Sequence, residues 1–209
     1  MPATPGTLAV AAHPIPLTVR VAAGLWLAVW LPVYAVRYGW ANFLHLSDIA
    51  VALTVIGLWT ASPLLISSQA VGVLFGELVW TADVAWRQFT GHHLIGGTEY
   101  LWDARFPLWL RLMTLYHLAL PVVLLWGLAR LGYDRRAPWL QTAIAALAIV
   151  VSRWTDPAQN INFAFRDPFL HRAWGPAPVH LAAMLLGLIV MGILPTHYLL
   201  SRFFARPDR

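Results

Sequence analysis

The chain has 209 residues, of which 59% are hydrophobic and 11% are charged, and its mean hydropathy is +0.64. Soluble domains carry about 25% charged residues. The composition therefore predicts an integral membrane protein. It contains no cysteine, and all 14 of its basic residues are arginine, which excludes a thiol or a lysine amine as a nucleophile. The net charge of +5 comes from arginines spread over loop ends, where they match lipid head groups, so we expect membrane lipids and no nucleic acid as partners.

The apolar segments predict an all-α protein, a polytopic transmembrane helix bundle of about six spans. A helix needs about 20 mainly apolar residues to cross the hydrocarbon core. The expected spans are residues 17–36, 48–66, 70–89, 107–131, 139–154 and 179–204. Residues 17–204 are therefore expected to form a single six-helix domain between tails at 1–16 and 205–209, as a multi-pass protein of the cell inner (plasma) membrane.

Several residues predict where these helices end and how they meet. Ser47-Asp48 can cap the second helix, and the short, uncharged connector at 67–69 predicts a tight hairpin between the second and third helices. Arg87 follows Asp83 by four residues, a spacing that allows an ion pair on one helix face. Pro121 predicts a kink in the fourth helix.

Two long polar loops, 91–103 and 155–178, are expected on the same side of the membrane as the turn at 37–47. We call this side the loop face. Its polar side chains are candidates for binding a lipid head group. These candidates are Thr98, Glu99, Asp103, Arg111, Asn160, Asn162 and Arg166. The alternative is that they only cap and close the loops.

Glu77 and His117 form the principal candidate site. Counted from the loop face at a rise of ~1.5 Å per residue, both lie about 15 Å deep, on the third and fourth helices. Charged groups at this depth cost a few kcal/mol even on lenient scales, so they are expected to face inward and pair. The carboxylate would then fix the imidazole tautomer while the imidazole moves a proton.

A hydroxyl from Thr54 or Thr114 is the candidate nucleophile that would complete a triad with His117 and Glu77. Thr54 lies about 10 Å from the loop face by the same count. The alternative is structural: Glu77 is protonated and bound to the backbone or to an indole N–H, and His117 is a neutral core residue.

A metal site is a second possibility, with His92, His93, Asp48 and Asp83 as reserve ligands. Together with other acids and histidines of the loop face, they would suit zinc or iron. No diagnostic spacing is present, such as two histidines four residues apart on one helix. Haem between two histidines is disfavoured, because His117 has no histidine partner at its depth. We therefore assign no metal, and the sequence specifies no cofactor.

Several motifs resemble a group of small, uncharacterised six-span bacterial "membrane-associated proteins". They are Gly97-Thr98-Glu99-Tyr100 with Asp103, Arg111, Thr114-Leu115-Tyr116-His117 with Pro121, Leu131-Gly132-Tyr133-Asp134-Arg135-Arg136-Ala137, Asn160-Ile161-Asn162 and Pro195-Thr196-His197. The resemblance covers most of the chain from about Asp48 onward. It supports the division into helices and implies no activity.

A weaker resemblance is to the androgen-induced gene 1 type of six-span lipid hydrolases, which use an intramembrane threonine and histidine. Thr54 matches in placement on the second helix, and His117 followed by Leu120-Pro121 matches on the fourth. The main hypothesis is therefore a lipid-directed hydrolase or acyl transferase. The alternative is a non-catalytic accessory subunit of a larger membrane complex that binds lipid, quinone or pigment. A small transporter would require repeat symmetry or discontinuous helices, and neither is evident.

Overall fold

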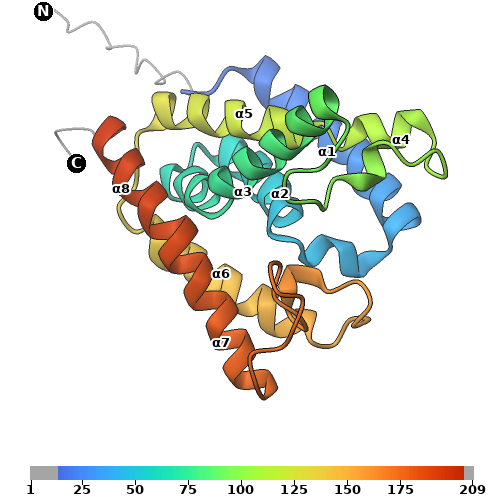
Figure 1. The fold of residues 1–209 in the computed structure, drawn as a ribbon. Helices are drawn as coiled ribbons and strands as arrows, with labels where there is room; N and C mark the ends of the chain where they lie inside the picture. The colour runs from blue at the N-terminus through green and yellow to red at the C-terminus, as the bar shows by residue number, and fades with distance from the viewer. Residues whose placement is uncertain (1–13, 205–209) are drawn as a thin grey trace, which may run out of the picture.

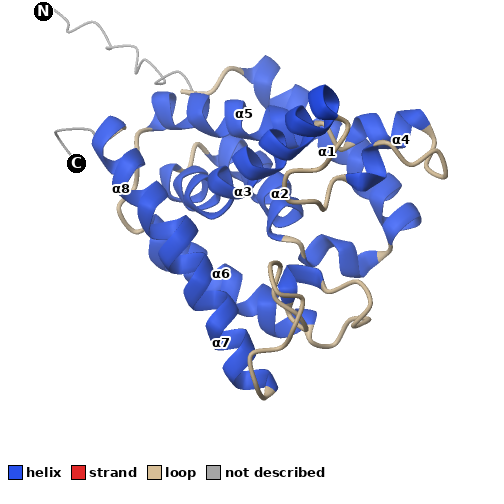
Figure 2. Ribbon diagram, in the orientation of Figure 1, coloured by secondary structure: helices blue, strands red, loops and turns tan. Residues whose placement is uncertain are grey.

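The computed structural model describes residues 14–204, which form helices joined by loops, without a β-strand in that range (Figure 2). The all-α prediction is confirmed. The elements are α1 (Leu17–Tyr38), η1 (Trp40–Leu44), α2 (Leu46–Thr60), α3 (Pro63–Thr90), η2 (Glu99–Leu101), α4 (Leu108–Met113), α5 (Tyr116–Leu131), α6 (Ala137–Ser152), η3 (Ile161–Phe163), α7 (Ala177–Leu188), the π-helical η4 (Ile189–Ile193) and α8 (Leu194–Phe203). Most of the expected tails, residues 1–13 and 205–209, lie outside the described residues.

Helix α3 lies in the middle of the bundle, where it packs against α2, α5 and α6 (Figure 1). Ile66, near its start, is fully buried. A Cβ atom added to Gly57 of α2 or to Gly127 of α5 would lie only 3.0 or 3.1 Å from the Ile66 side chain. Small residues at such contacts let helix backbones approach closely. Helices α2 and α5 therefore meet α3 at the same residue.

The turn between α2 and α3 lies earlier than the sequence indicated. The expected connector at 67–69 is part of α3, which begins at Pro63 with the Ser62 side chain accepting from the Leu65 N–H. Proline has no N–H to donate, so it ends the preceding helix yet suits the first position of the next one. Ala61 takes a left-handed conformation with φ 47° to complete the turn.

Two of the predicted long helices are interrupted. The fourth divides into α4 and α5 at Thr114-Leu115, whereas α5 continues through Pro121, where the sequence predicted a kink. The last predicted helix divides into α7, η4 and α8. Its π-helical segment ends just before Pro195, which cannot donate to the helical ladder, so the hydrogen-bond register changes there.

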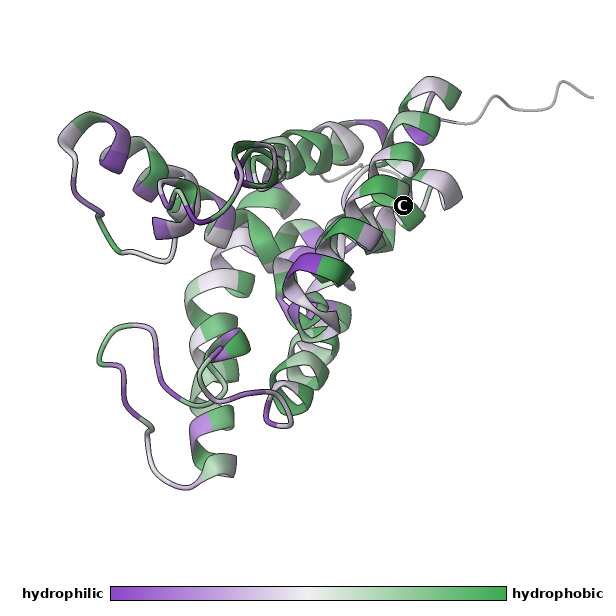
Figure 3. Cartoon of the chain, turned by 90° about the vertical axis from the view of Figure 1, so that its right-hand side faces the viewer, coloured by the Kyte–Doolittle hydropathy of each residue, from purple (hydrophilic) through white to green (hydrophobic). Residues whose placement is uncertain are grey.

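Four helices are long and apolar enough to cross a membrane by length and composition: 17–38, 63–90, 108–131 and 177–203. Helices α2 and α6 are apolar but have only 15 and 16 residues. At ~1.5 Å per residue each is about 23 Å long, short of the ~30 Å hydrocarbon core. Figure 3 shows hydrophobic residues along the long helices, with runs of hydrophilic residues in the loops.

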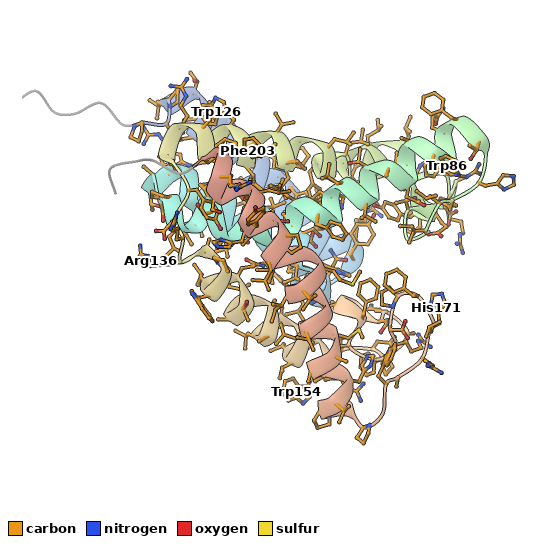
Figure 4. The ribbon with its side chains drawn as sticks, turned by 60° about the vertical axis from the view of Figure 1, so that its left-hand side comes forward. Trp86, Trp126, Arg136, Trp154, His171 and Phe203 are labelled. Atoms are coloured by element: carbon orange, nitrogen blue, oxygen red, sulfur yellow. The ribbon has the colours of Figure 1, made fainter. Side chains whose placement is uncertain are left out.

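Aromatic side chains lie exposed near the helix ends. Trp154 and Phe203 are each 78% exposed, and Figure 4 places Trp154 with His171 at the end of the molecule opposite to Trp126. An exposed tryptophan at a helix end, such as Trp154, is typical of the aromatic belt at a membrane surface.

The contact of α3 with α6 gives a test of the packing. A Cβ on Gly72 would lie 2.2 Å from Nε2 and 2.8 Å from Cγ of Gln141, whose side chain is fully buried. Overpacking of this kind costs about 1–3 kcal/mol. We expect Gly72→Ala to lower the melting temperature of the purified protein. Gly76→Ala is the matched control, because nothing lies within 4 Å of its added Cβ; equal losses in both variants would contradict the packing argument.

Candidate functional site

Glu77 of α3 and His117 of α5 contact each other inside the bundle. The Glu77 carboxylate lies 2.6 Å from Nδ1 of His117. Glu77 is 2% exposed, and the His117 side chain is 14% exposed. The contact expected from their equal depth is present, and their catalytic roles remain predictions. Because Nδ1 faces Glu77, Nε2 is the ring nitrogen available to a ligand.

Two aromatic rings hold His117 in place. The Trp80 ring stacks at 4.7 Å between centroids and the Tyr116 ring at 4.1 Å. Trp80 also donates from its indole N–H to the Tyr100 hydroxyl at 3.0 Å. The imidazole plane is therefore fixed by stacking and its rotation by the bond to Glu77, which is the preorganisation that proton transfer requires.

Asp48 forms a second buried carboxyl contact next to this stack. The Tyr116 hydroxyl donates to Asp48 at 2.6 Å, and the Asn42 amide donates to the other carboxyl oxygen. The predicted capping role of Asp48 is wrong, since it lies inside the first turn of α2 and His45 occupies the cap position without a side-chain bond. The carboxyl group instead joins η1, α2 and α5.

A cavity of about 460 Å³ opens beside His117 toward η1 and the loop before α4. It is lined by aromatic residues Tyr34, Tyr38, Trp80, Tyr100, Tyr116 and Phe163, and by Asn42, His45, Ser47, Asp48, Gly97, Thr114 and His117. We call it the polar cavity. A smaller cavity of about 270 Å³ is lined by Glu77, His117 and Asn162 among others. Burial, aided by nearby His117, lowers the pKa of His45 to about 4, so its ring is neutral at pH 7.

The two predicted nucleophiles lie in different places. Thr114 lines the polar cavity and donates its hydroxyl to the Arg111 carbonyl at 2.6 Å. Thr54 lines a separate apolar cavity, and its buried hydroxyl has no partner among the described residues. Thr54 and His117 therefore line different cavities, because depth along a helix does not define the face a residue occupies, and the role of Thr54 as nucleophile stays a prediction. Ser47, taken only as a cap residue from the sequence, lines both cavities next to His117.

Asp83 organises the loop after α3. Its carboxylate accepts from the N–H groups of residues 94–96 at 2.7 to 3.0 Å and from the Thr98 hydroxyl, and it lies 2.8 Å from Nδ1 of His93. The expected ion pair with Arg87 is wrong, because that guanidinium donates to the Gly91 carbonyl. Thr98 is 1% exposed. Its hydroxyl donates to Asp83 and so supports the loop instead of contacting a lipid head group.

The other predicted binding residues before α4 also contact their own loop. Asp103 pairs with Arg105 at 2.6 Å, and the side-chain bond with Arg105 lowers the pKa of Asp103. Arg111 donates to the Leu101 carbonyl at 2.9 Å. Glu99 is exposed. These contacts close the loop and bring Gly97 and Tyr100 to the polar cavity.

In the loop after α6, Asn160 accepts from two backbone N–H groups and donates to the Arg166 carbonyl at 2.9 Å. Arg166 donates to the Pro157 carbonyl at 3.3 Å. Asn162 donates to the Leu44 carbonyl at 2.7 Å, which joins this loop to η1. Their main contacts are therefore within the protein, and Asn162 alone of the three also lines the smaller cavity beside His117.

The reserve metal ligands do not come together. Asp83 and His93 are in contact, His92 is exposed on the same loop, and Asp48 lines the polar cavity with its own donors. Within residues 14–204 there is no group of three histidine, aspartate or glutamate side chains placed to hold a metal ion.

Fold and site together define an all-helical protein with four helices that could cross a membrane and a buried carboxyl–imidazole pair beside a polar cavity. Comparison with protein-family models, curated proteins and solved structures found no match.

The carboxylate of Asp83 gives a test of how the loop is held. Asp83→Ala removes the acceptor of three backbone N–H groups, and a hydrogen bond to a charged group contributes about 1.5–3 kcal/mol. We therefore expect the amides of residues 94–96 to exchange hydrogen at least about tenfold faster, as measured by mass spectrometry. Asp103→Ala, which removes a carboxylate paired with the exposed Arg105, is the control and should leave this exchange unchanged. Equal exchange in both variants would show that Asp83 does not hold the loop.

Proposed function

We propose that this protein is a multi-pass enzyme of the plasma membrane, a lipid-directed hydrolase or acyl transferase. In this proposal the four long helices cross the bilayer, and α2 and α6 complete a bundle of six spans as its short members. The observation that carries the proposal is the 2.6 Å contact between Glu77 and Nδ1 of His117 beside a cavity lined with hydroxyl groups.

The chemistry follows from the roles of the two groups. His117 Nε2 takes the proton of an attacking hydroxyl, whose oxygen bonds to the carbonyl carbon of a lipid ester. Glu77 stabilises the imidazolium that forms, and the imidazolium then gives its proton to the departing alcohol oxygen. Water takes up the acyl group in a hydrolase, and a second alcohol takes it up in a transferase.

Thr114 and Ser47 are the hydroxyl groups proposed for the attack. Both line the polar cavity that His117 also lines. Thr114 now donates to the carbonyl of Arg111, so it must rotate toward His117 to react. If neither hydroxyl is the nucleophile, His117 would activate a water molecule directly, as a general base.

A non-catalytic subunit that binds quinone is the second candidate, and the aromatic wall of the polar cavity favours it. Tyr34, Tyr38, Trp80 and Tyr100 surround the space beside His117, and flat rings stack well on such side chains. This alternative predicts that protein extracted in mild detergent keeps a quinone or pigment in a larger assembly and turns over no lipid ester.

The pair Glu77–His117 is tested by substitution. We expect His117→Ala to lower turnover of a lipid ester by about 10²–10⁴-fold, the usual contribution of a positioned acid–base group. Glu77→Gln keeps the size of the side chain and removes its charge, so it should lower kcat and leave KM nearly unchanged. Turnover is measured with purified protein in lipid nanodiscs.

His197→Ala is the matched control, because His197 also contacts a polar partner, the Tyr133 hydroxyl at 2.7 Å, at the other end of the bundle. It should retain full turnover. Melting temperatures of all three variants show whether a loss reflects unfolding. A folded His117→Ala protein that works as fast as the unaltered chain would remove His117 from the mechanism.

A further inference from the structure

The polar cavity has no arginine among the described residues of its wall. The nearby Arg111 points its guanidinium to the Leu101 carbonyl. The wall offers instead phenol and hydroxyl groups, an amide, the neutral His45 ring and the carboxyl group of Asp48. A phosphate in this space would meet Asp48, with Glu77 on the other side of the His117 ring, and would find no guanidinium to pair with.

An apolar cavity lies on the other side of Tyr116. It has a volume of about 460 Å³ between α1, α2 and α5, and Tyr116 lines both this space and the polar cavity. Its wall contains alanine, valine and leucine side chains, including Ala23, Val51 and Val123. A cavity of this size and lining suits a hydrocarbon chain.

Tyr116 is the wall that the two cavities share, and it lies next to the His117 ring. The boundary between polar and apolar space therefore lies beside His117. Tyr116 donates its hydroxyl to Asp48 at 2.6 Å, and its ring stacks on His117 at 4.1 Å. Because Tyr116 separates the two spaces, one molecule reaches both only when the Tyr116 side chain rotates away from Asp48, and its linking group then lies next to His117.

We propose that the site binds a neutral lipid with free hydroxyl groups, of the monoacylglycerol class. Its glycerol head occupies the polar cavity, its chain occupies the apolar cavity, and its ester lies beside His117. This assignment rests on the proposed function for the role of the ester, whereas the choice of a neutral head with hydroxyl groups rests on the missing arginine and on the phenol, hydroxyl and amide groups of the cavity wall.

Binding is tested with ether-linked probes, which cannot be hydrolysed. The three probes carry the same long chain on glycerol, on glycerol phosphate or on a trimethylammonium group, and binding to the protein in nanodiscs is measured at equilibrium. We expect the glycerol ether to bind at least about tenfold more tightly than the phosphate, because the phosphate loses its hydration without gaining a charged partner. Equal or tighter binding of either charged probe would overturn the assignment.

The effect of the missing arginine on head-group selectivity is tested by introducing an arginine into the wall of the polar cavity. Asn42 is a half-buried residue of the polar-cavity wall and donates to Asp48, so Asn42→Arg should tighten binding of the phosphate ether by about tenfold or more. Gln159→Arg adds the same charge at an exposed position of the loop face and should change nothing. If a folded Asn42→Arg protein binds the phosphate no better than the control, the absence of arginine does not set the selectivity.

The apolar cavity is tested by filling it. Ala23→Trp should weaken binding of the long-chain glycerol ether at least about tenfold and affect a short-chain analogue much less. Ala146, which is equally half-buried and lines a different apolar cavity between α6 and α7, gives the control Ala146→Trp. Equal effects of the two substitutions, or no effect of the first, would contradict the chain's placement.

These measurements separate this assignment from the proposed function. Selective binding of the glycerol ether without turnover of its ester would support the assignment and refute the enzyme. Turnover with unselective binding of the probes would support the enzyme and refute the assignment.

Discussion

Helix α3 is apolar enough to cross a membrane, yet it carries two buried carboxyl groups, Glu77 and Asp83. A buried charge without a partner is too costly to keep, so each group requires its own set of donors. Glu77 contacts His117 and thereby fixes α5 against α3. Asp83 binds the backbone of the loop that follows α3 and thereby sets where the chain enters α4. The arrangement around the polar cavity depends on satisfying these two carboxyl groups.

The break between α4 and α5 belongs to the same arrangement. Thr114 closes the end of α4 with its hydroxyl, and α5 starts at Tyr116, so that Tyr116 and His117 occupy the first turn of a helix. Adjacent residues of a helix point about 100° apart, so the two side chains reach different neighbours although their rings stack at 4.1 Å between centroids. One ring contacts Asp48 of α2 and the other contacts Glu77 of α3. Two neighbouring side chains of α5 thus join it to two different helices.

The sequence was sufficient for the parts that depend on depth and composition. It predicted the all-α class, the approximate helices and the contact of Glu77 with His117, because two ionisable groups at one depth must avoid lipid. It was insufficient wherever the position of a residue depends on which face of its helix points toward the site. Thr54 has the right depth but faces the apolar cavity, and Asp48 was taken as a cap because nothing local indicates that Tyr116, 68 positions away, donates to it. The polar residues 67–69 were taken as the connector, whereas the chain turns before Pro63, the first residue of α3, as the preference of proline for the first helical position would have indicated.

The short helix α2 explains why a polar cavity fits inside an apolar bundle. With 15 residues, α2 is about 23 Å long, so in the proposed membrane orientation it leaves about 7 Å of a ~30 Å hydrocarbon core unfilled. Its first turn carries Ser47 and Asp48, and the space above that turn is covered by η1 and by the loop that Asp83 holds. In that proposed orientation the polar side chains would lie within the depth of the bilayer, in a cavity whose wall comes from α1, α2, α3, α5 and the loops that cover it. In the proposed enzyme a bound lipid would exclude water from this space and so strengthen each electrostatic contact within it, which is the condition under which a carboxylate and an imidazole are most effective as an acid–base pair.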